Sequence, residues 1–217
     1  MQGQLVVVVA HPDDESLGAG GTIYKLTQAG MVPHVICLSN GVGARDDGDV
    51  DGRLAEFRAA MEILGVKHYE IGPFPDNQFD DIPRLRISQW IQHRFAKIQP
   101  NLVITHSSAD LNIDHRLTHE VVLHGCRPSD RMIWQVWGCE IPSSTEWGMR
   151  PFAPNVYSVL IGEAAKKREE AIKCYKSELR KFPHPRSITG VTAREVCRGT
   201  EGGLGLAVAF ELIREVI

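Results

Sequence analysis

The chain has 217 residues, a hydrophobic fraction of 43% and a formal net charge of −3 at pH 7. This length and apolar content fit one α/β domain with a core that needs no covalent staple, so we expect residues 1–217 to form a single domain. The slight negative charge, with Lys and Arg mixed among acidic residues, argues against nucleic acid as a partner.

Strand and helix signals alternate along the chain, which is typical of a parallel sheet covered by helices on both faces. Apolar, β-branched runs predict buried strands at residues 5–10, 35–38, 69–71, 102–105, 134–139 and 156–160. Apolar residues at helical spacing predict helices at residues 18–29, 51–64, 82–98, 116–126, 163–181 and from 205 to the C-terminus. We expect the many charges of the 163–181 helix to form a solvated face.

The cysteine pattern and the N-terminus bear on the compartment. Five cysteines form an odd set without a CxxC pair, which speaks against a disulfide framework and against a thiolate zinc site. We expect them to be buried, reduced thiols of a cytoplasmic protein. No signal peptide is evident and no apolar run is long enough to span a bilayer, so membrane insertion is not expected. The composition and the cysteine pattern are also compatible with a homo-oligomer.

A polar pentapeptide follows the first predicted strand directly. Residues 5–10 lead into His11-Pro12-Asp13-Asp14-Glu15, and open α/β sheets bind their ligands at the carboxyl ends of the strands. Pro12 restricts the backbone within the group. Taken alone, the pentapeptide also fits an ordinary turn and helix cap.

A second polar cluster, residues 106–115, follows the predicted strand at 102–105 in the same way. Because both clusters begin where a parallel strand stops, we expect them to meet in space although about a hundred residues separate them. His11 and His115, with a carboxylate from Asp13 or Asp14, would supply three ligands to a divalent metal and leave one position open for water. The remaining carboxylate could take a proton from that water, which predicts a hydrolytic site. Asp114 could instead simply cap the following helix.

The two clusters resemble the motifs of the PIG-L (LmbE-like) family of metal-dependent N-deacetylases. The similarity lies in residues 10–15 and 110–116, and weaker similarity extends to residues 53–56, 143–147, 183–187 and 198–199. The resemblance implies an α/β, Rossmann-like three-layer sandwich with a mostly parallel sheet. It also implies hydrolytic removal of the acetyl group from an N-acetylglucosamine-type amino sugar or its conjugate, with zinc as cofactor and ferrous iron as the alternative.

The resemblance further implies roles for individual residues. The metal ligands would be His11, Asp14 and His115, and Asp13 would be the general base. Arg53 matches a substrate-binding arginine, although an exposed helix charge would look the same. Two residues of the weaker segments, Trp147 and His184, are also expected to bind substrate.

One position departs from the family. Many relatives have His-Pro-Asp-His where this chain has Asn112-Ile113-Asp114-His115, and the first histidine helps to stabilise the tetrahedral intermediate. Asn112 can donate a hydrogen bond to an oxyanion but cannot titrate near neutrality. Protonation of the leaving amine would then fall to Asp13, His106 or His184, and the catalytic contribution of Asp114 is left open.

Two other functions fit parts of the pattern. Two histidines and one carboxylate also form the triad of non-haem iron oxygenases, although the alternation of strands and helices favours the hydrolase. A catalytically silent sugar- or nucleotide-binding module on the same scaffold is the alternative from another class.

Overall fold

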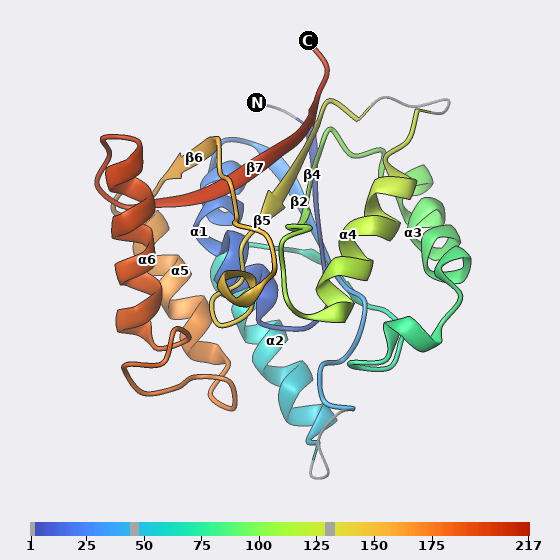
Figure 1. The fold of residues 1–217 in the computed structure, drawn as a ribbon, viewed down its shortest axis with the longest axis horizontal. Helices are drawn as coiled ribbons and strands as arrows, with labels where there is room; N and C mark the ends of the chain where they lie inside the picture. Colours follow the sequence, from blue (N-terminus) through green and yellow to red (C-terminus); the bar gives the residue numbers. More distant parts are fainter. Residues whose placement is uncertain (1–2, 44–47, 129–132) are drawn as a thin grey trace.

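The computed structural model describes residues 3–43, 48–128 and 133–217. Seven strands form one sheet in the order β3-β2-β1-β4-β5-β7-β6 (Figure 1). The strands are β1 (Gly3–Val9), β2 (Met31–Cys37), β3 (His68–Ile71), β4 (Leu102–His106), β5 (Gln135–Cys139), β6 (Val156–Val159) and β7 (Ala207–Glu215). Strands β1 to β5 run parallel, whereas β7 pairs antiparallel with both β5 and β6.

Helices cover both faces of the sheet. Helices α1 (Asp14–Gln28), α2 (Val50–Leu64), α5 (Glu163–Cys174) and α6 (Ile188–Glu201) pack with one set of buried strand residues. Helices α3 (Arg84–Ile98) and α4 (Ile113–Gly125) pack with the other set, and two short 3₁₀ turns, η1 (Phe79–Asp81) and η2 (Thr145–Trp147), lie in loops. The predicted α/β, Rossmann-like three-layer sandwich with a mostly parallel sheet is confirmed.

The C-terminal prediction is wrong. The region predicted as a helix from residue 205 forms strand β7 (Ala207–Glu215) instead, and the preceding helix α6 was not predicted. Ala207 to Phe210 are all buried, because β7 fills the position between β5 and β6. Ladder hydrogen bonds and burial in that position override the helical propensity of the Ala, Leu and Glu residues. The start of α6 is capped by Ser187, whose side chain accepts the Gly190 N–H.

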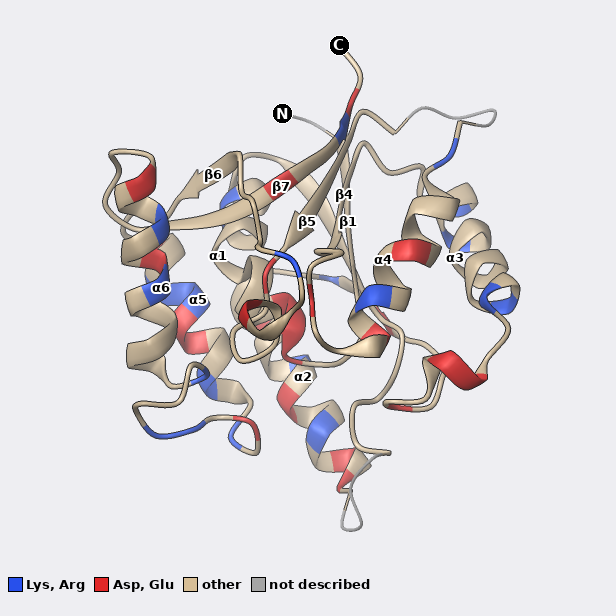
Figure 2. Ribbon diagram, in the orientation of Figure 1, with Lys and Arg blue, Asp and Glu red and all other residues tan. Residues whose placement is uncertain are grey.

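The charged helix predicted at residues 163–181 is shorter, since α5 ends at Cys174. Figure 2 shows acidic and basic residues interspersed over α2, α5 and α6. The expectation of a solvated face is wrong for two charged residues of this range, Arg168 and Glu178, which are buried. Arg168 is buried and forms an ion pair with the buried Glu195 of α6. The two helices are therefore joined by a charge pair taken out of water.

Helices α1 and α4 begin three or four residues earlier than predicted, and these earlier starts place the polar clusters. Helix α1 begins at Asp14 rather than residue 18, and α4 begins at Ile113 rather than residue 116. His115 thus belongs to the first turn of α4, and β1 and β4 are neighbours in the sheet. The end of β1 and the start of α4 therefore meet at one edge of the sheet.

Candidate active site

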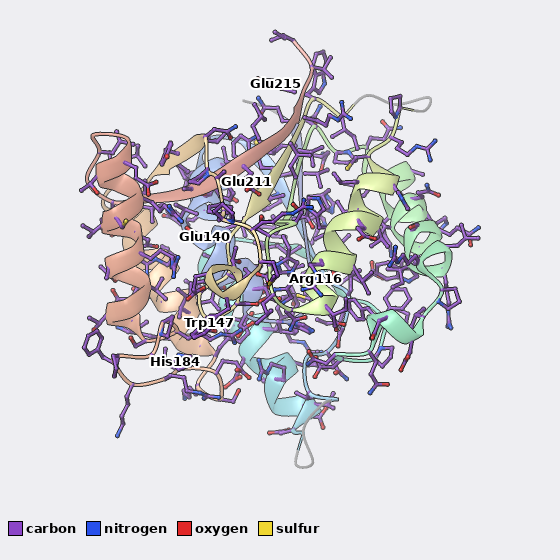
Figure 3. All side chains as sticks on the ribbon, in the orientation of Figure 1. Arg116, Glu140, Trp147, His184, Glu211 and Glu215 are labelled. Carbon is purple, nitrogen blue, oxygen red and sulfur yellow. The ribbon has the colours of Figure 1, made fainter. Side chains whose placement is uncertain are left out.

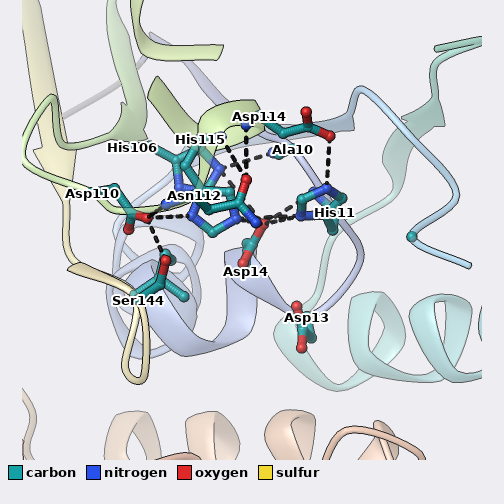
Figure 4. Close-up of polar contacts among 12 residues, drawn as sticks. Ala10, His11, Asp13, Asp14, His106, Asp110, Asn112, Asp114, His115 and Ser144 are labelled. Atoms are coloured by element: carbon teal, nitrogen blue, oxygen red, sulfur yellow. Dashed lines mark hydrogen bonds and ion pairs between the residues drawn. The ribbon is translucent and has the colours of Figure 1, made fainter. Parts of the chain in front are cut away.

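Three side chains from the two polar clusters converge at the carboxyl ends of β1 and β4 (Figure 4). His11 Nδ1 lies 3.4 Å from Asp14 Oδ2, His115 Nε2 lies 3.3 Å from the same oxygen, and the two nitrogens are 3.3 Å apart. Asp14 and His115 are buried and His11 is nearly so. The three potential ligand atoms thus form an almost equilateral triangle.

The triangle has the dimensions that a tetrahedral metal site requires. A tetrahedral ion with ligand bonds of about 2.0–2.1 Å holds neighbouring ligand atoms about 3.3–3.4 Å apart. Two imidazoles and a carboxylate are suitable ligands for zinc or ferrous iron. Asp14 Oδ1 is buried and has no hydrogen-bond partner among the described residues, so this carboxylate is undersatisfied by the protein itself. The donor set therefore fits a divalent cation.

Two carboxylates face the outer nitrogen of His11. His11 Nε2 lies 3.1 Å from Asp114 Oδ2 and 3.1 Å from Asp76 Oδ1. Asp114 is buried and also accepts the backbone N–H groups of Asn77 and Phe79. It does not cap α4, because the N-cap is Asn112. Asp114 is thus placed to orient His11, and it lies on the far side of the ring from the triangle.

Asp110 faces the outer nitrogen of His115, as Asp114 and Asp76 face that of His11. Its Oδ1 lies 3.2 Å from His115 Nδ1, and its carboxylate also accepts the hydroxyls of Ser144 and Thr145 and the N–H of Asn112. Burial alone lowers the pKa of His115, but the carboxylates of Asp14 and Asp110 outweigh burial and raise this pKa to about 9. A carboxylate behind a histidine ligand fixes its ring orientation and increases its basicity.

We expect Asp110→Asn to weaken metal binding by about 10–100-fold, because an amide holds and polarises His115 less well than a carboxylate. Competition with a chromophoric chelator measures this affinity. Asp80→Asn, an exposed change in η1, is the control. Equal affinities of the two variants would show that Asp110 does not act through His115.

His106 packs against His115 and is fully buried. Its ring stacks on that of His115 at a centroid distance of 4.0 Å, and its Nε2 accepts the Ala10 N–H at 2.9 Å. Burial is the main cause that lowers the pKa of His106 to about 3. His106 is therefore neutral and fully buried, which makes it unsuitable as a proton donor to a leaving group.

Asp13 stands apart from this contact network (Figure 4). Its φ of 115° is unusual for a residue other than glycine, and its N–H donates to the buried Glu15. Glu15 also accepts the hydroxyls of Ser16 and Tyr175. Burial raises the pKa of the Asp13 carboxyl to about 7, although the Arg186 guanidinium acts in the opposite direction. A carboxyl with this pKa can both accept and return a proton near neutrality.

A buried charge network surrounds Asp13. Arg186 Nη1 lies 2.8 Å from Asp13 Oδ2 and 3.4 Å from Glu178 Oε2. Arg53 also pairs with Glu178, and its Nη1 donates to the Pro12 carbonyl at 3.1 Å. Arg53 is only 4% exposed, so the alternative expectation that it is an exposed charge on a helix is wrong.

Asn112 presents its amide in a defined orientation. Its Oδ1 accepts the N–H groups of Asp114 and His115 at the start of α4, at 2.8 and 3.4 Å. The cap therefore orients Nδ2 away from the helix, where it lies 3.3 Å from Asn77 Oδ1. The Nδ2 group is a fixed donor beside the triangle.

A cavity of about 120 Å³ opens over this site. Its lining combines residues from both polar clusters and from the charge network, and includes His11, Asp13, Arg53, Asp76, Asn112, His115, Glu178 and Arg186. Trp147 and His184 are not among the lining residues. Trp147 is 69% exposed on η2, and the His184 ring accepts the backbone N–H of Arg186 (Figure 3).

The sequence interpretation did not single out several residues of the cavity and its support. Asp76, Glu178 and Arg186 line the cavity, and Asp110 lies behind His115. Arg186 and Asp110 lie within segments that carry the family resemblance, so a closer reading of those segments could have found them. Asp76 and Glu178 carried no such signal, because only the fold brings them to the site.

The α/β sandwich carries a candidate metal site at the carboxyl ends of its parallel strands, and sequence comparison identifies the family. Residues 6–126 match the PIG-L family, described as GlcNAc-PI de-N-acetylase. The chain belongs to this family, which confirms the resemblance seen in the two motifs.

Curated relatives include both deacetylases and a hydratase. The chain is 37% identical over 81 residues to diacetylchitobiose deacetylase of Thermococcus kodakarensis, covering 35% of this chain and 30% of that protein. It is 34% identical over 130 residues to 4-oxalmesaconate hydratase of Pseudomonas putida, covering 54% and 48%. These matches span half the length of the relatives or less. An uncharacterised Escherichia coli deacetylase, YaiS, is 28% identical over 178 residues, covering 80% and 90%.

Solved structures share the fold. The conserved protein TT1542 from Thermus thermophilus has a TM-score of 0.80 at 23% identity, covering 100% of this chain and 97% of that one. N,N'-diacetylchitobiose deacetylase from Pyrococcus horikoshii has a TM-score of 0.78 at 17% identity, covering 97% and 83%. Within the described residues, no helix is both long and apolar enough to cross a membrane.

Proposed function

We propose that the protein is a metal-dependent N-deacetylase that hydrolyses the acetamide of an N-acetylglucosamine-type amino sugar or its conjugate. The observation that carries this proposal is the triangle of His11 Nδ1, Asp14 Oδ2 and His115 Nε2 at a cavity that Asp13 also lines. These three residues would hold zinc, with ferrous iron as the alternative. The bound ion would polarise the acetyl carbonyl and lower the pKa of a coordinated water.

Asp13 is assigned the role of general base. Its carboxyl lines the cavity, and its pKa, raised by burial, suits proton transfer near neutrality. Arg186 holds the carboxyl at 2.8 Å, and the Glu15 side chain accepts the Asp13 N–H at 3.1 Å. Arg53 donates a hydrogen bond to the Pro12 carbonyl in the same loop and also lines the cavity.

The leaving amine is expected to receive its proton from Asp13. His106 is buried and His184 lies outside the cavity lining, which leaves Asp13 as the favoured one of the three donors considered from sequence. Asn112 Nδ2 is assigned to donate to the oxyanion that develops on the acetyl oxygen. Asp114 acts through His11 as a positioning residue, and Trp147 remains a proposed contact for the part of the substrate outside the cavity.

The hydratase relative supports a second candidate, the addition of water to an unsaturated acid. The charges in the cavity favour the deacetylase. Arg53 and Arg186 both pair with Glu178, and Arg186 pairs with Asp13 as well. A substrate with several carboxylates needs cationic partners that are not already neutralised, whereas an acetamide and a sugar ring need only hydrogen bonds.

The other two functions considered from sequence are less well supported. The combination of a base, a fixed amide donor and three convergent ligand atoms exceeds what a silent binding module needs. Membership of the PIG-L family favours hydrolysis over the oxygen chemistry of non-haem iron enzymes. The expectation of five buried cysteines is wrong, because only Cys37 and Cys139 are buried and Cys197 is exposed. All five are free, which is compatible with the proposed cytoplasmic location, and we propose that residues 1–217 act as one domain.

Acetate release tests the proposal. The purified protein, with its metal content measured, is assayed with N-acetylglucosamine, its methyl glycoside, N,N'-diacetylchitobiose, N-acetylglucosamine 1-phosphate and a nucleotide-linked N-acetylglucosamine. We expect acetate and free amine in equal amounts from at least one compound. A chelator should stop the reaction, and added zinc or ferrous iron should restore it, because the ligand atoms are placed to hold such an ion.

Parallel assays separate the alternatives. Loss of 4-oxalmesaconate absorbance without acetate release would favour the hydratase, and oxygen consumption with ferrous iron and 2-oxoglutarate would favour the oxygenase. Sugar binding by metal-loaded protein without acetate release from any compound would contradict the deacetylase and favour the binding module.

A further inference from the structure

A second groove, with a volume of about 560 Å³, lies beside the cavity along the start of α4. Its walls come from the loop after β4, from α4 and from the segment after η2. The loop after β4 lies between the two spaces, because Leu111 lines the groove and its neighbour Asn112 lines the cavity. Leu111 is 51% exposed, so a ligand can extend across it from one space to the other.

The charges of this groove differ from those of the cavity. Arg116, on the first turn of α4 (Figure 3), bonds to the carbonyls of Asp110 and Leu111 but pairs with no carboxylate within the described residues. Arg150, an exposed residue of the groove wall, likewise forms no ion pair in the described parts of the chain. Of the acids in the walls, Glu120 pairs with Arg84 at 2.9 Å, and Asp110 is engaged by His115, Ser144 and Thr145. Two positive charges are therefore available in the groove.

A buried histidine also contributes a polar atom to the groove. His119 is 9% exposed, and its Nδ1 lies 2.8 Å from the carbonyl oxygen of His106. That contact makes Nδ1 the protonated nitrogen and leaves Nε2 as an acceptor. Nε2 has no hydrogen-bond partner among the residues that the structure describes, and His119 lines the groove. It can accept a bond from a ligand hydroxyl.

We propose that this groove binds the acidic, hydroxyl-bearing aglycone of the substrate while the acetamide occupies the cavity. The anionic group pairs with Arg116 and Arg150, and a hydroxyl donates to His119 Nε2. This inference rests on the proposed function. The groove would then select acidic conjugates, since the arginines of the cavity are already paired with carboxylates.

Binding of compounds that cannot be deacetylated tests the groove directly. Calorimetry with the metal-loaded protein compares glucose 1-phosphate with methyl α-glucoside, which lacks the charge. We expect the phosphate to bind at least about tenfold more tightly at low salt, and the difference to shrink at high salt because the arginines are partly exposed. Equal affinities for the two compounds would overturn the proposal.

Variants locate the anion. Arg150→Gln should remove most of the preference for glucose 1-phosphate, and Arg116→Gln provides a second test from another element. Arg86→Gln, on the exposed side of α3, is the matched control and should keep the full preference. A preference unchanged by Arg150→Gln and Arg116→Gln would place the phosphate elsewhere, for example on the metal, and would overturn the groove assignment.

The outcome is distinguishable from failure of the deacetylase itself. Acetate release from N-acetylglucosamine 1-phosphate and from the neutral methyl glycoside with equal KM would retain the proposed function and reject the groove. An arginine-dependent preference for glucose 1-phosphate in a protein that releases no acetate from any compound would retain the groove and reject the deacetylase.

Discussion

Replacement of Asp13 by asparagine is expected to reduce acetate release by about 10²–10⁴-fold while metal content stays at the wild-type level. The amide cannot accept a proton, but it keeps the shape of the side chain. Asparagine also tolerates the positive φ of this position better than most residues, so the turn should persist. The measurement combines initial rates of acetate release with elemental analysis of the same samples.

The control for this variant is Asp81→Asn, an exposed acid in η1 that makes the same chemical change away from the cavity. It should keep wild-type activity. If Asp13→Asn retained wild-type turnover, another residue would have to be the base. If it lost metal together with activity, Asp13 would contribute to the metal site rather than to proton transfer alone.

Replacement of His115 by alanine is expected to remove both metal and activity. The change deletes Nε2, one of the three atoms of the triangle, and leaves the buried Asp14 carboxylate without one of its partners. Two remaining ligands bind a divalent ion much more weakly than three. Metal content after gel filtration should fall well below one ion per chain, and acetate release should fall with it.

His93→Ala removes an exposed histidine of α3 and is the matched control, which should keep metal and activity. Thermal unfolding of both variants without metal shows whether His115→Ala is folded. A folded His115→Ala protein with a full complement of metal would contradict the assignment of this ligand.

Much of the architecture and the centre of the site could be predicted from local sequence patterns. The run Leu5 to Ala10 reads as a buried strand because apolar, β-branched residues suit a strand covered on both faces. The strand at residues 102–105 reads in the same way, and the end of each leads into a polar cluster. The convergence of His11 and His115 then follows from the rule that parallel strands present their carboxyl ends at one edge of a sheet.

Other features depended on contacts between segments far apart in the chain. Residues 207–215 have a composition that suits a helix, and only the position between β5 and β6 makes them a strand. Arg53 and Arg186 could be noticed in the sequence, but their common partner Glu178 could not, because it lies 125 residues from Arg53. Local propensity carries no information about such pairs.

The sequence by itself determined the layered α/β fold and the residue types at its reactive edge, since hydrophobic periodicity and strand-end position are local properties. Only the tertiary structure decided which carboxylate serves each histidine. Asp114 and Asp76 face His11, Asp110 faces His115, and Asp13 is held by Arg186. The physical reason is that burial removes water from these groups, so each charge must find its partner in the protein, and that partner is set by packing across the whole chain.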